Sequence, residues 1–221
     1  MTKAFTLDEH LEEMRGVADG AGVPFKEVWR LHLLGELTKA SCSMIGASGE
    51  AIGRSGVLQV RAFDWNTDFG LQSEPLLIVY HSSVPGSVQY SLATWAGIIF
   101  ALTGVNENQL GVGQIGISCP HCAPYFGEDS RRGMPFPFVL KYILGHEQHM
   151  SGADAFLQKV RRTCNILVGV GSGLEGDFAG YQYSATVLRR YNDSNLEPVG
   201  AWHPRFPVRA LRTASVNIFE C

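Results

Sequence analysis

Apolar residues in the first forty positions recur every three or four residues, which is the spacing of a helix with one buried face. A Thr-x-x-Glu capping box at residues 6–9 begins a first helix, positions 7, 11, 14 and 17 form its apolar side, and Gly20 ends it. Pro24 suits the first turn of a second helix that places Phe25, Val28 and Trp29 on one side. We therefore expect two helices between residues 6 and 38.

From Cys42 onward the chain changes to short β-rich runs separated by glycines. Strands are expected at residues 43–47, 56–63, 75–81, 87–94, 97–104 and 110–118. Helical patterns at 137–147 and 152–163 follow, and then two strands at 165–171 and 181–191 with a Gly-rich connection between them. This order of elements defines an α+β layered fold with mainly antiparallel sheets and no internal repeats.

The composition is that of an ordinary globular domain with enough apolar material for a sizeable core. The 221 residues are 45% hydrophobic and 18% charged, and the formal net charge of −3 indicates no nucleic-acid partner. The longest apolar runs, 76–80 and 97–102, are far shorter than the roughly 20 residues that span a bilayer. No signal peptide is evident, so the location is unknown from the sequence: lysosomal or secreted if a longer N-terminus exists, and otherwise cytoplasmic.

Cys42 begins the first predicted strand directly after the helical segment, and this position has a chemical meaning. Cleavage of the peptide bond between Ser41 and Cys42 would give Cys42 a free α-amino group, whose unperturbed pKa is about 7.7–8. Such an amine acts as a general base near neutral pH, and it lies on the same residue as the thiol that it deprotonates. The alternative for Cys42 is a small buried apolar side chain.

Arg61 and Asp64 form an Arg-x-x-Asp group about twenty residues after Cys42. A hairpin over residues 42–64 would return both beside Cys42, where they would orient the amine and hold the substrate. Strand alternation places positions three apart on opposite faces, so a bulge or the strand end must re-aim one of them. The alternative is an ion pair at a strand edge, which contributes about 0–1 kcal/mol if exposed.

Four stretches together resemble the N-terminal-nucleophile (Ntn) cysteine hydrolases. They are CSMIGA from Cys42, VRAFDW with the Arg-x-x-Asp group, TWAGIIFALTGVNENQLGVGQ at 94–114 and GMPFPFVLKYIL at 133–144. The order and spacing of these stretches are most similar to the acid ceramidase-like, penicillin acyltransferase-type and phospholipase B-like members. The resemblance runs from about residue 7 to about residue 205, and the leading helices match the family's propeptide.

This resemblance implies a four-layer αββα sandwich and a hydrolase or acyltransferase that acts on linear amides, including lipid amides. It implies that Cys42 is the nucleophile exposed by autocleavage, that Arg61 lies beside its thiol, and that Asp64 holds its α-amino group. Gln114 is the nearest polar residue to the position where relatives carry an oxyanion or substrate residue, and its amide can donate a hydrogen bond. The alternative for Gln114 is an ordinary sheet residue. No cofactor or metal is implied.

The resemblance also implies a division of the chain. Residues 1–41 would become a helical light chain after autocleavage and stay as a partner of the β-rich domain at 42–221. The family continues with further strands where this sequence reads PVRALRTASVNIFEC, so the β-rich domain is expected to be incomplete at its C-terminus. Asn217 is the only Asn in this tail. A shortened, catalytically inactive relative or a gene fragment is therefore an alternative to an active enzyme.

A thiol pair provides a further alternative. Cys119-Pro-His-Cys122 is a C-x-x-C sequence after a predicted strand, as in thiol-disulfide oxidants, but no helix pattern follows it. Metal binding by Cys119, His121 and Cys122 would lack a fourth ligand. The five cysteines are an odd number and leave at least one thiol free. The simplest interpretation of Cys119 and Cys122 is a pair that sometimes forms a disulfide.

Overall fold

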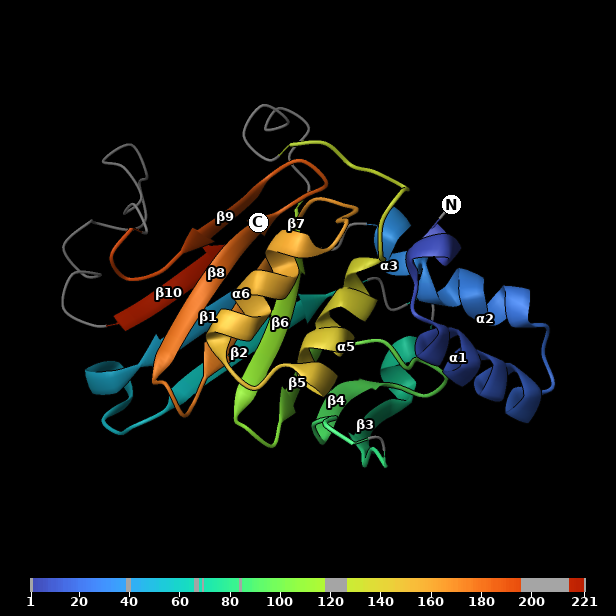
Figure 1. Cartoon of the computed structure of the whole chain (residues 1–221), viewed down its shortest axis with the longest axis horizontal. Coiled ribbons are helices and arrows are strands. Elements are labelled where there is room, and N and C mark those ends of the chain that lie inside the picture. The colour runs from blue at the N-terminus through green and yellow to red at the C-terminus, as the bar shows by residue number, and fades with distance from the viewer. Residues whose placement is uncertain are drawn as a thin grey trace.

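The computed structural model (Figure 1) describes residues 2–38, 41–65, 68, 70–83, 85–117, 127–195 and 215–220, and for residue 41 and 215–220 it describes the backbone alone. The α-helices are α1 (Asp8–Ala21), α2 (Phe25–His32), α3 (Leu34–Leu37), α5 (Phe136–His146) and α6 (Met150–Lys159). Short 3₁₀ turns lie at Thr2–Phe5, Gly49–Ile52 and Leu71–Ser73. None of the helices within the described ranges is long and apolar enough to cross a membrane.

The strands form two antiparallel sheets. They are β1 (Ser41–Ser48), β2 (Val57–Asp64), β3 (Pro75–Tyr80), β4 (Tyr90–Trp95), β5 (Thr103–Asn106), β6 (Leu110–Gly116), β7 (Ile166–Ser172), β8 (Asp177–Tyr183), β9 (Leu188–Tyr191) and β10 (Ser215–Glu220). The smaller sheet has the order β10-β1-β2, and the larger sheet runs from β3 to β9 in sequence order. The predicted α+β class and antiparallel pairing are confirmed.

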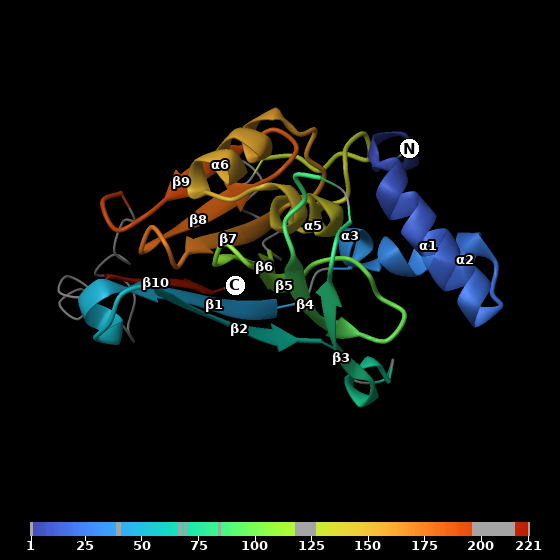
Figure 2. The ribbon, with the colours of Figure 1, turned by 60° about the horizontal axis from the view of Figure 1, so that its bottom comes forward.

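The two sheets stack face to face (Figure 2), and glycines lie in the interface between them. A Cβ atom on Gly169 of the larger sheet would lie 2.5 Å from the Met44 sulfur, and one on Gly46 of β1 would lie 2.2 Å from the Phe178 ring. Glycine at these positions lets a buried Met and a buried Phe fill the interface from opposite sides. The stacking fixes the inner face of the β1–β2 hairpin against β6, β7 and β8.

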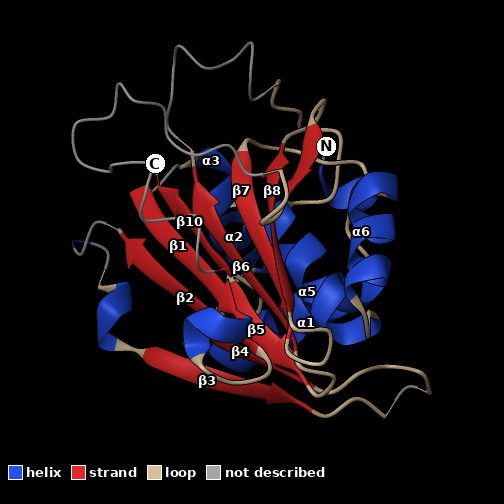
Figure 3. Cartoon of the chain, turned by 90° about the vertical axis from the view of Figure 1, so that its left-hand side faces the viewer, coloured by secondary structure: helices blue, strands red, loops and turns tan. Residues whose placement is uncertain are grey.

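The other face of the larger sheet is covered by α5 and α6, which lie together on one side of the strands (Figure 3). Phe138, Leu140 and Leu144 of α5 are fully buried, as are Val168 and Val170 of β7. Burial of each such side chain stabilises the fold by about 1.5–3 kcal/mol. The main core therefore lies between this sheet and its helices.

The N-terminal helices pack against α5 through polar as well as apolar contacts. Lys141 of α5 is 2% exposed and forms an ion pair with Glu13 of α1. Tyr80 of β3 donates a 2.6 Å hydrogen bond to the same carboxylate. His10 of α1 stacks on Phe138, with 5.0 Å between ring centroids. The helical segment is thus integrated into the body of the molecule.

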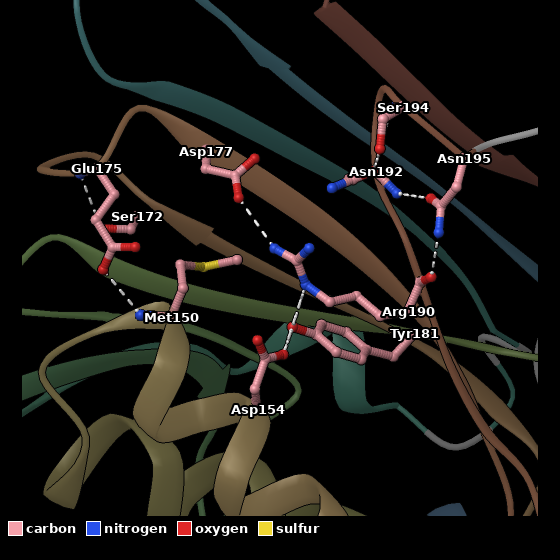
Figure 4. A network of polar contacts seen from close by, with 10 residues as sticks. All are labelled: Met150, Asp154, Ser172, Glu175, Asp177, Tyr181, Arg190, Asn192, Ser194 and Asn195. Carbon is pink, nitrogen blue, oxygen red and sulfur yellow. Dashed lines mark hydrogen bonds and ion pairs between the residues drawn. The ribbon is translucent and has the colours of Figure 1, made fainter.

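A polar network joins α6 to the β8–β9 edge (Figure 4). Tyr181 of β8 donates to Asp154 of α6 and accepts a 3.3 Å hydrogen bond from Arg190 Nε of β9. Arg190 Nη2 donates to Asp177 at 3.0 Å. Burial raises the pKa of the Tyr181 hydroxyl to a value well above its usual range, and the contact with Asp154 acts in the same direction. The network fixes α6 on the sheet, and it lies on the helix side, away from Cys42.

The described residues form three layers, which are the small sheet, the large sheet and the helices. The fourth layer implied by the sequence resemblance is not confirmed. The outer face of the small sheet carries Ile45, Leu58 and Val60, which are 38%, 46% and 51% exposed. Over the described ranges, no α-helix lies on this face.

Several local predictions were wrong. α1 continues past Gly20 to Ala21 and has Gly22 as its C-cap, and α6 ends at Lys159 rather than at residue 163. Residues 97–102 are not a strand, and β5 begins only at Thr103. The segment predicted as one strand at 181–191 contains the end of β8, a turn and β9. The predicted capping box does not form, because the N-cap of α1 is Leu7 and the Thr6 hydroxyl donates to the Thr2 carbonyl instead.

Candidate active site

Cys42 is the second residue of β1, directly after the helical segment, as predicted. Its side chain is 2% exposed and packs between the sheets with Ile115, Leu167 and Phe178. The backbone of Ser41 already belongs to the strand, where it pairs with Asp64. The predicted cleavage junction therefore lies at the point where the N-terminal segment enters the small sheet.

Arg61 of β2 lies beside the Cys42 thiol. The hairpin pairs Cys42 with Phe63 and Met44 with Arg61, so Arg61 projects from the same face of the sheet as Cys42. Its Nη2 lies 3.9 Å from Cys42 Sγ, its Nε donates to the Gln114 carbonyl at 2.5 Å, and its Nη1 donates to the Thr103 hydroxyl at 3.5 Å. Three strands thus hold the guanidinium in place.

The electrostatics of Arg61 follow from its partial burial. Desolvation lowers the pKa of the guanidinium, and the nearby Cys42 and Asp64 act in the opposite direction. An arginine stays protonated even in such a site. The guanidinium also lies over the Phe63 ring, 4.5 Å from its centroid. The result is a fixed positive charge next to the sulfur.

Asp64 is the last residue of β2 and lies directly opposite Ser41. Exposed and half-buried residues alternate along β2 without interruption, so Asp64 lies on the exposed face and Arg61 on the inner face. No bulge re-aims either residue. The structure brings the backbone of Asp64 next to that of Ser41, but the Asp64 side chain lies on the opposite face of the sheet from the Cys42 thiol, so the expected re-aiming at the strand end is not observed.

Gln114 lies on β6 with its side chain 5% exposed. It pairs with Val168, which packs in the helix-side core, whereas its neighbour Ile115 packs with Cys42 on the other face. The side chain therefore lies on the far face of the large sheet from the thiol. Only the backbone carbonyl of Gln114 reaches the site, through its hydrogen bond from Arg61.

Aromatic residues lie beside Cys42 and Arg61. Phe63 stacks on Trp65 and lies 5.2 Å from the Trp95 ring centroid. All three rings line an apolar cavity at the junction with the N-terminal segment. Two further residues were not predicted from the sequence, Thr103 beside Arg61 and Glu36 in the cavity, because both depend on contacts between distant segments.

Cys119, His121 and Cys122 lie outside the described residues, so the thiol-pair and metal alternatives have no structural test. Within the part of the chain that is described, no group of three or more His, Cys, Asp or Glu residues is arranged to hold a metal ion. The free cysteines described are Cys42 and Cys164, both buried.

No family model matches the chain. Two curated proteins of Dictyostelium discoideum are similar to it, and both are 33% identical. Protein dcd1A matches over 205 residues, which is 90% of this chain and 45% of that protein. Protein dcd1B matches over 210 residues, which is 95% of this chain and 40% of that protein. The chain thus spans less than half the length of these relatives.

Two solved structures are also similar. A Caenorhabditis elegans ortholog of N-acylethanolamine-hydrolyzing acid amidase is 15% identical, with a TM-score of 0.47 over 69% of this chain and 65% of that chain. Penicillin V acylase from Agrobacterium tumefaciens is 14% identical, with a TM-score of 0.36 over 70% of this chain and 43% of that chain. Because both similarities are low, they settle neither the fold nor the activity of this chain.

Proposed function

We propose that the chain is the precursor form of an Ntn-type cysteine hydrolase or acyltransferase that acts on a linear amide. The observation that carries this proposal is the position of Cys42. Its thiol lies 3.9 Å from the Arg61 guanidinium, at the second position of a strand whose first residue pairs with Asp64. A buried structural cysteine requires neither a cation beside its sulfur nor a carboxylate opposite the preceding residue.

Maturation needs no group beyond those at this junction and water. The Cys42 sulfur attacks the Ser41 carbonyl carbon, the bond from that carbon to the Cys42 nitrogen breaks, and the nitrogen takes the thiol proton. Water then hydrolyses the Ser41 thioester and leaves a carboxylate on Ser41. The products are a free thiol and a free α-amino group on Cys42.

The mature site would use both groups of Cys42 on an external amide. The α-amine takes the thiol proton, the sulfur attacks the acyl carbon, and the leaving amine departs with a proton. The resulting thioester is resolved by water or by another amine. Asp64 would hold the α-amino group, and Arg61 would stabilise the negative charge that develops beside the sulfur.

The N-terminal segment would stay bound as a light chain after cleavage. Glu13 neutralises Lys141, and Glu36 accepts hydrogen bonds from the Phe136 backbone at 2.7 Å and the Thr163 hydroxyl at 2.8 Å. Departure of the segment would leave a buried ammonium without a counterion, which is strongly unfavourable. An acylated amine or a lipid amide is the proposed substrate class.

Intact-mass analysis tests the proposal. The purified chain, incubated at mildly acidic and neutral pH, should convert into two fragments separated between residues 41 and 42, and Cys42→Ala should stay uncut. Cys164→Ala is the matched control, because it removes the other described buried thiol and should leave cleavage unchanged. A wild-type chain that stays uncut under all these conditions would refute the proposal and favour the catalytically inactive alternative.

A further inference from the structure

Three buried polar atoms that lack a hydrogen-bond partner within the described part of the chain belong to residues that line one cavity. They are Glu36 Oε2, Trp65 Nε1 and Asn165 Oδ1. Buried polar atoms in folded proteins are nearly always paired, so each exception needs a physical explanation. Three exceptions around one cavity indicate that a bound polar group completes their hydrogen bonds.

The cavity has a volume of about 50 Å³ and lies between the N-terminal segment and the body. Its walls are mainly apolar and include Leu34, Trp95, Ile98 and Phe100. A single water needs about 10–15 Å³ by the same measure, so the cavity holds only a few non-hydrogen atoms. An apolar cavity with a few converging polar groups is the usual form of a small-molecule site.

The cavity adjoins the candidate active site. Phe63 and Gln114 line it, and both contact Arg61, Phe63 through its ring and Gln114 through its backbone carbonyl. Phe63 also pairs with Cys42 across the hairpin. A group bound in this cavity would therefore lie close to the residues that face the thiol.

The three unpaired atoms define the chemistry of the bound group. The Trp65 indole only donates, and Asn165 Oδ1 only accepts, because its amide nitrogen donates to the Gly127 carbonyl at 3.2 Å. Glu36 is 4% exposed, and Arg131 Nη1 lies 4.0 Å from its unpaired oxygen. Burial raises the pKa of this carboxyl, so it can carry a proton and donate as well as accept. A matching ligand needs both an acceptor and a donor at one end.

We propose that this cavity is a specificity pocket for a short acyl group that ends in a hydroxyl or carboxamide. The proposal rests on the function proposed above, because it takes the bound group to be the acyl group of the amide substrate, in a cavity lined by Phe63, the residue that pairs with Cys42 across the hairpin. It names a narrower substrate class than lipid amides, since a plain hydrocarbon end leaves Glu36, Trp65 and Asn165 unpaired. Leaving such buried groups unpaired is what rejects an analogue that lacks the polar end.

A binding experiment on the uncut Cys42→Ala chain tests the pocket without catalysis. The probes are 3-hydroxy-N,N-dimethylpropanamide and N,N-dimethylbutanamide, which differ by a hydroxyl in place of a methyl group and whose dimethylated amide end has no N–H to donate, and calorimetry gives both affinities. The hydroxylated amide should bind roughly five- to tenfold more tightly, as expected for one or two hydrogen bonds. Equal or tighter binding of N,N-dimethylbutanamide, or no binding of either probe, would overturn the inference.

Two tryptophan variants identify the source of this preference. Trp65→Phe keeps an aromatic ring but removes the unpaired N–H, so the preference for the hydroxylated probe should fall to about twofold or less. Trp95→Phe is the matched control in the same wall and should keep the preference. If both variants lose the preference equally, ring packing explains it and the inference is wrong.

Turnover separates this inference from the proposed function. The substrates are the 3-hydroxypropanoyl and butanoyl amides of a fluorogenic amine, assayed with the mature chain. A preference in binding with no turnover of either amide would refute the catalytic proposal alone. Turnover of the butanoyl amide at an equal or higher kcat/KM would refute the specificity pocket alone.

Discussion

Arg61 is the residue on which the chemistry of Cys42 depends most directly. Arg61 projects from β2, and its guanidinium contacts the Cys42 thiol of β1, the Gln114 carbonyl of β6 and the Thr103 hydroxyl of β5. A planar fork with several donors is suited to this arrangement, and a lysine ammonium cannot reproduce it. The cation is therefore both a source of charge and a clamp between the two sheets.

Substitution of Arg61 should slow autocleavage. We expect Arg61→Met to reduce the cleavage rate by roughly 10²- to 10³-fold, because it removes the fixed donor beside the reacting sulfur. Arg61→Lys should retain part of the rate through its charge. The rates are measured by intact mass over time, with Arg54→Met, an exposed arginine of the same hairpin, as the control. A wild-type rate in Arg61→Met would exclude a role for the cation.

Individual site residues differ in how far the sequence predicted them. The proximity of Cys42 and Arg61 was predictable because the strands that carry them are consecutive in the chain and pair as one hairpin. The face of Gln114 was not, because nearly every residue of β6 is buried and the strand shows no polar alternation to read. Glu36 was missed because its role arises only from contacts with residues more than 90 positions away.

Among the elements, α1 and α5 are joined by an ion pair whose two ends differ in burial. The Lys141 side chain is 2% exposed, whereas that of Glu13 is 30% exposed. Desolvation lowers the pKa of Lys141, and Glu13 acts in the opposite direction. The carboxylate thus offsets part of the cost of burying the charged amine.

Removal of this carboxylate should destabilise the helical segment. We expect Glu13→Gln to lower the free energy of unfolding by roughly 2–4 kcal/mol, toward the lower end because Glu13 is partly exposed. The double variant Glu13→Gln with Lys141→Met should recover much of the loss, because no charge is left buried. Urea unfolding measures both. Glu12→Gln, at an exposed i,i+3 pair, is the control and should change stability by less than about 0.5 kcal/mol.

Hydrophobic periodicity predicted the helices and most strands. It failed where an apolar segment is buried without forming a helix or a strand. Residues 98–102 form an apolar run that is buried as a loop, and the backbone N–H groups of Ile99 and Ala101 donate to His32 Nε2 and the Pro137 carbonyl. An apolar run of this length is typical of a strand. A buried loop is possible only when distant segments supply hydrogen-bond partners for its backbone, and local sequence does not reveal those partners. The pairing of β10 with β1 was likewise not predictable from local pattern.

At the scale of the whole molecule, two buried histidines of the N-terminal segment make the free energy of unfolding depend on pH. His10 and His32 are 3% and 0% exposed. Burial lowers the pKa of His10 to about 3 and that of His32 to about 4. His32 Nδ1 contacts the Val28 carbonyl and its Nε2 accepts from the Ile99 N–H, so the folded state needs the neutral ring.

The sign of the pH dependence follows from these lowered values. Both rings stay neutral in the folded chain, while an unfolded chain binds protons below about pH 6.5. The stabilisation is therefore complete above pH 6.5 and is lost as the pH falls toward 4 and then 3. Glu36 acts in the opposite direction, because burial raises its pKa and the folded form binds its proton first. Two histidines against one carboxyl leave a net loss of stability in mild acid.

We therefore expect the free energy of unfolding to fall between pH 7 and pH 5, by roughly 2 kcal/mol for each buried imidazole before the offset from Glu36. Urea unfolding at the two pH values measures the difference. His10→Phe keeps the ring stacked on Phe138 and should remove about half of the pH dependence, whereas His149→Gln, whose side chain is 64% exposed, should leave it unchanged. Equal stability of the wild-type chain at both pH values would show that these rings are accessible to protons in the folded state. The same measurement on the Cys42→Ala chain separates this effect from cleavage, because that chain keeps its two segments joined at every pH.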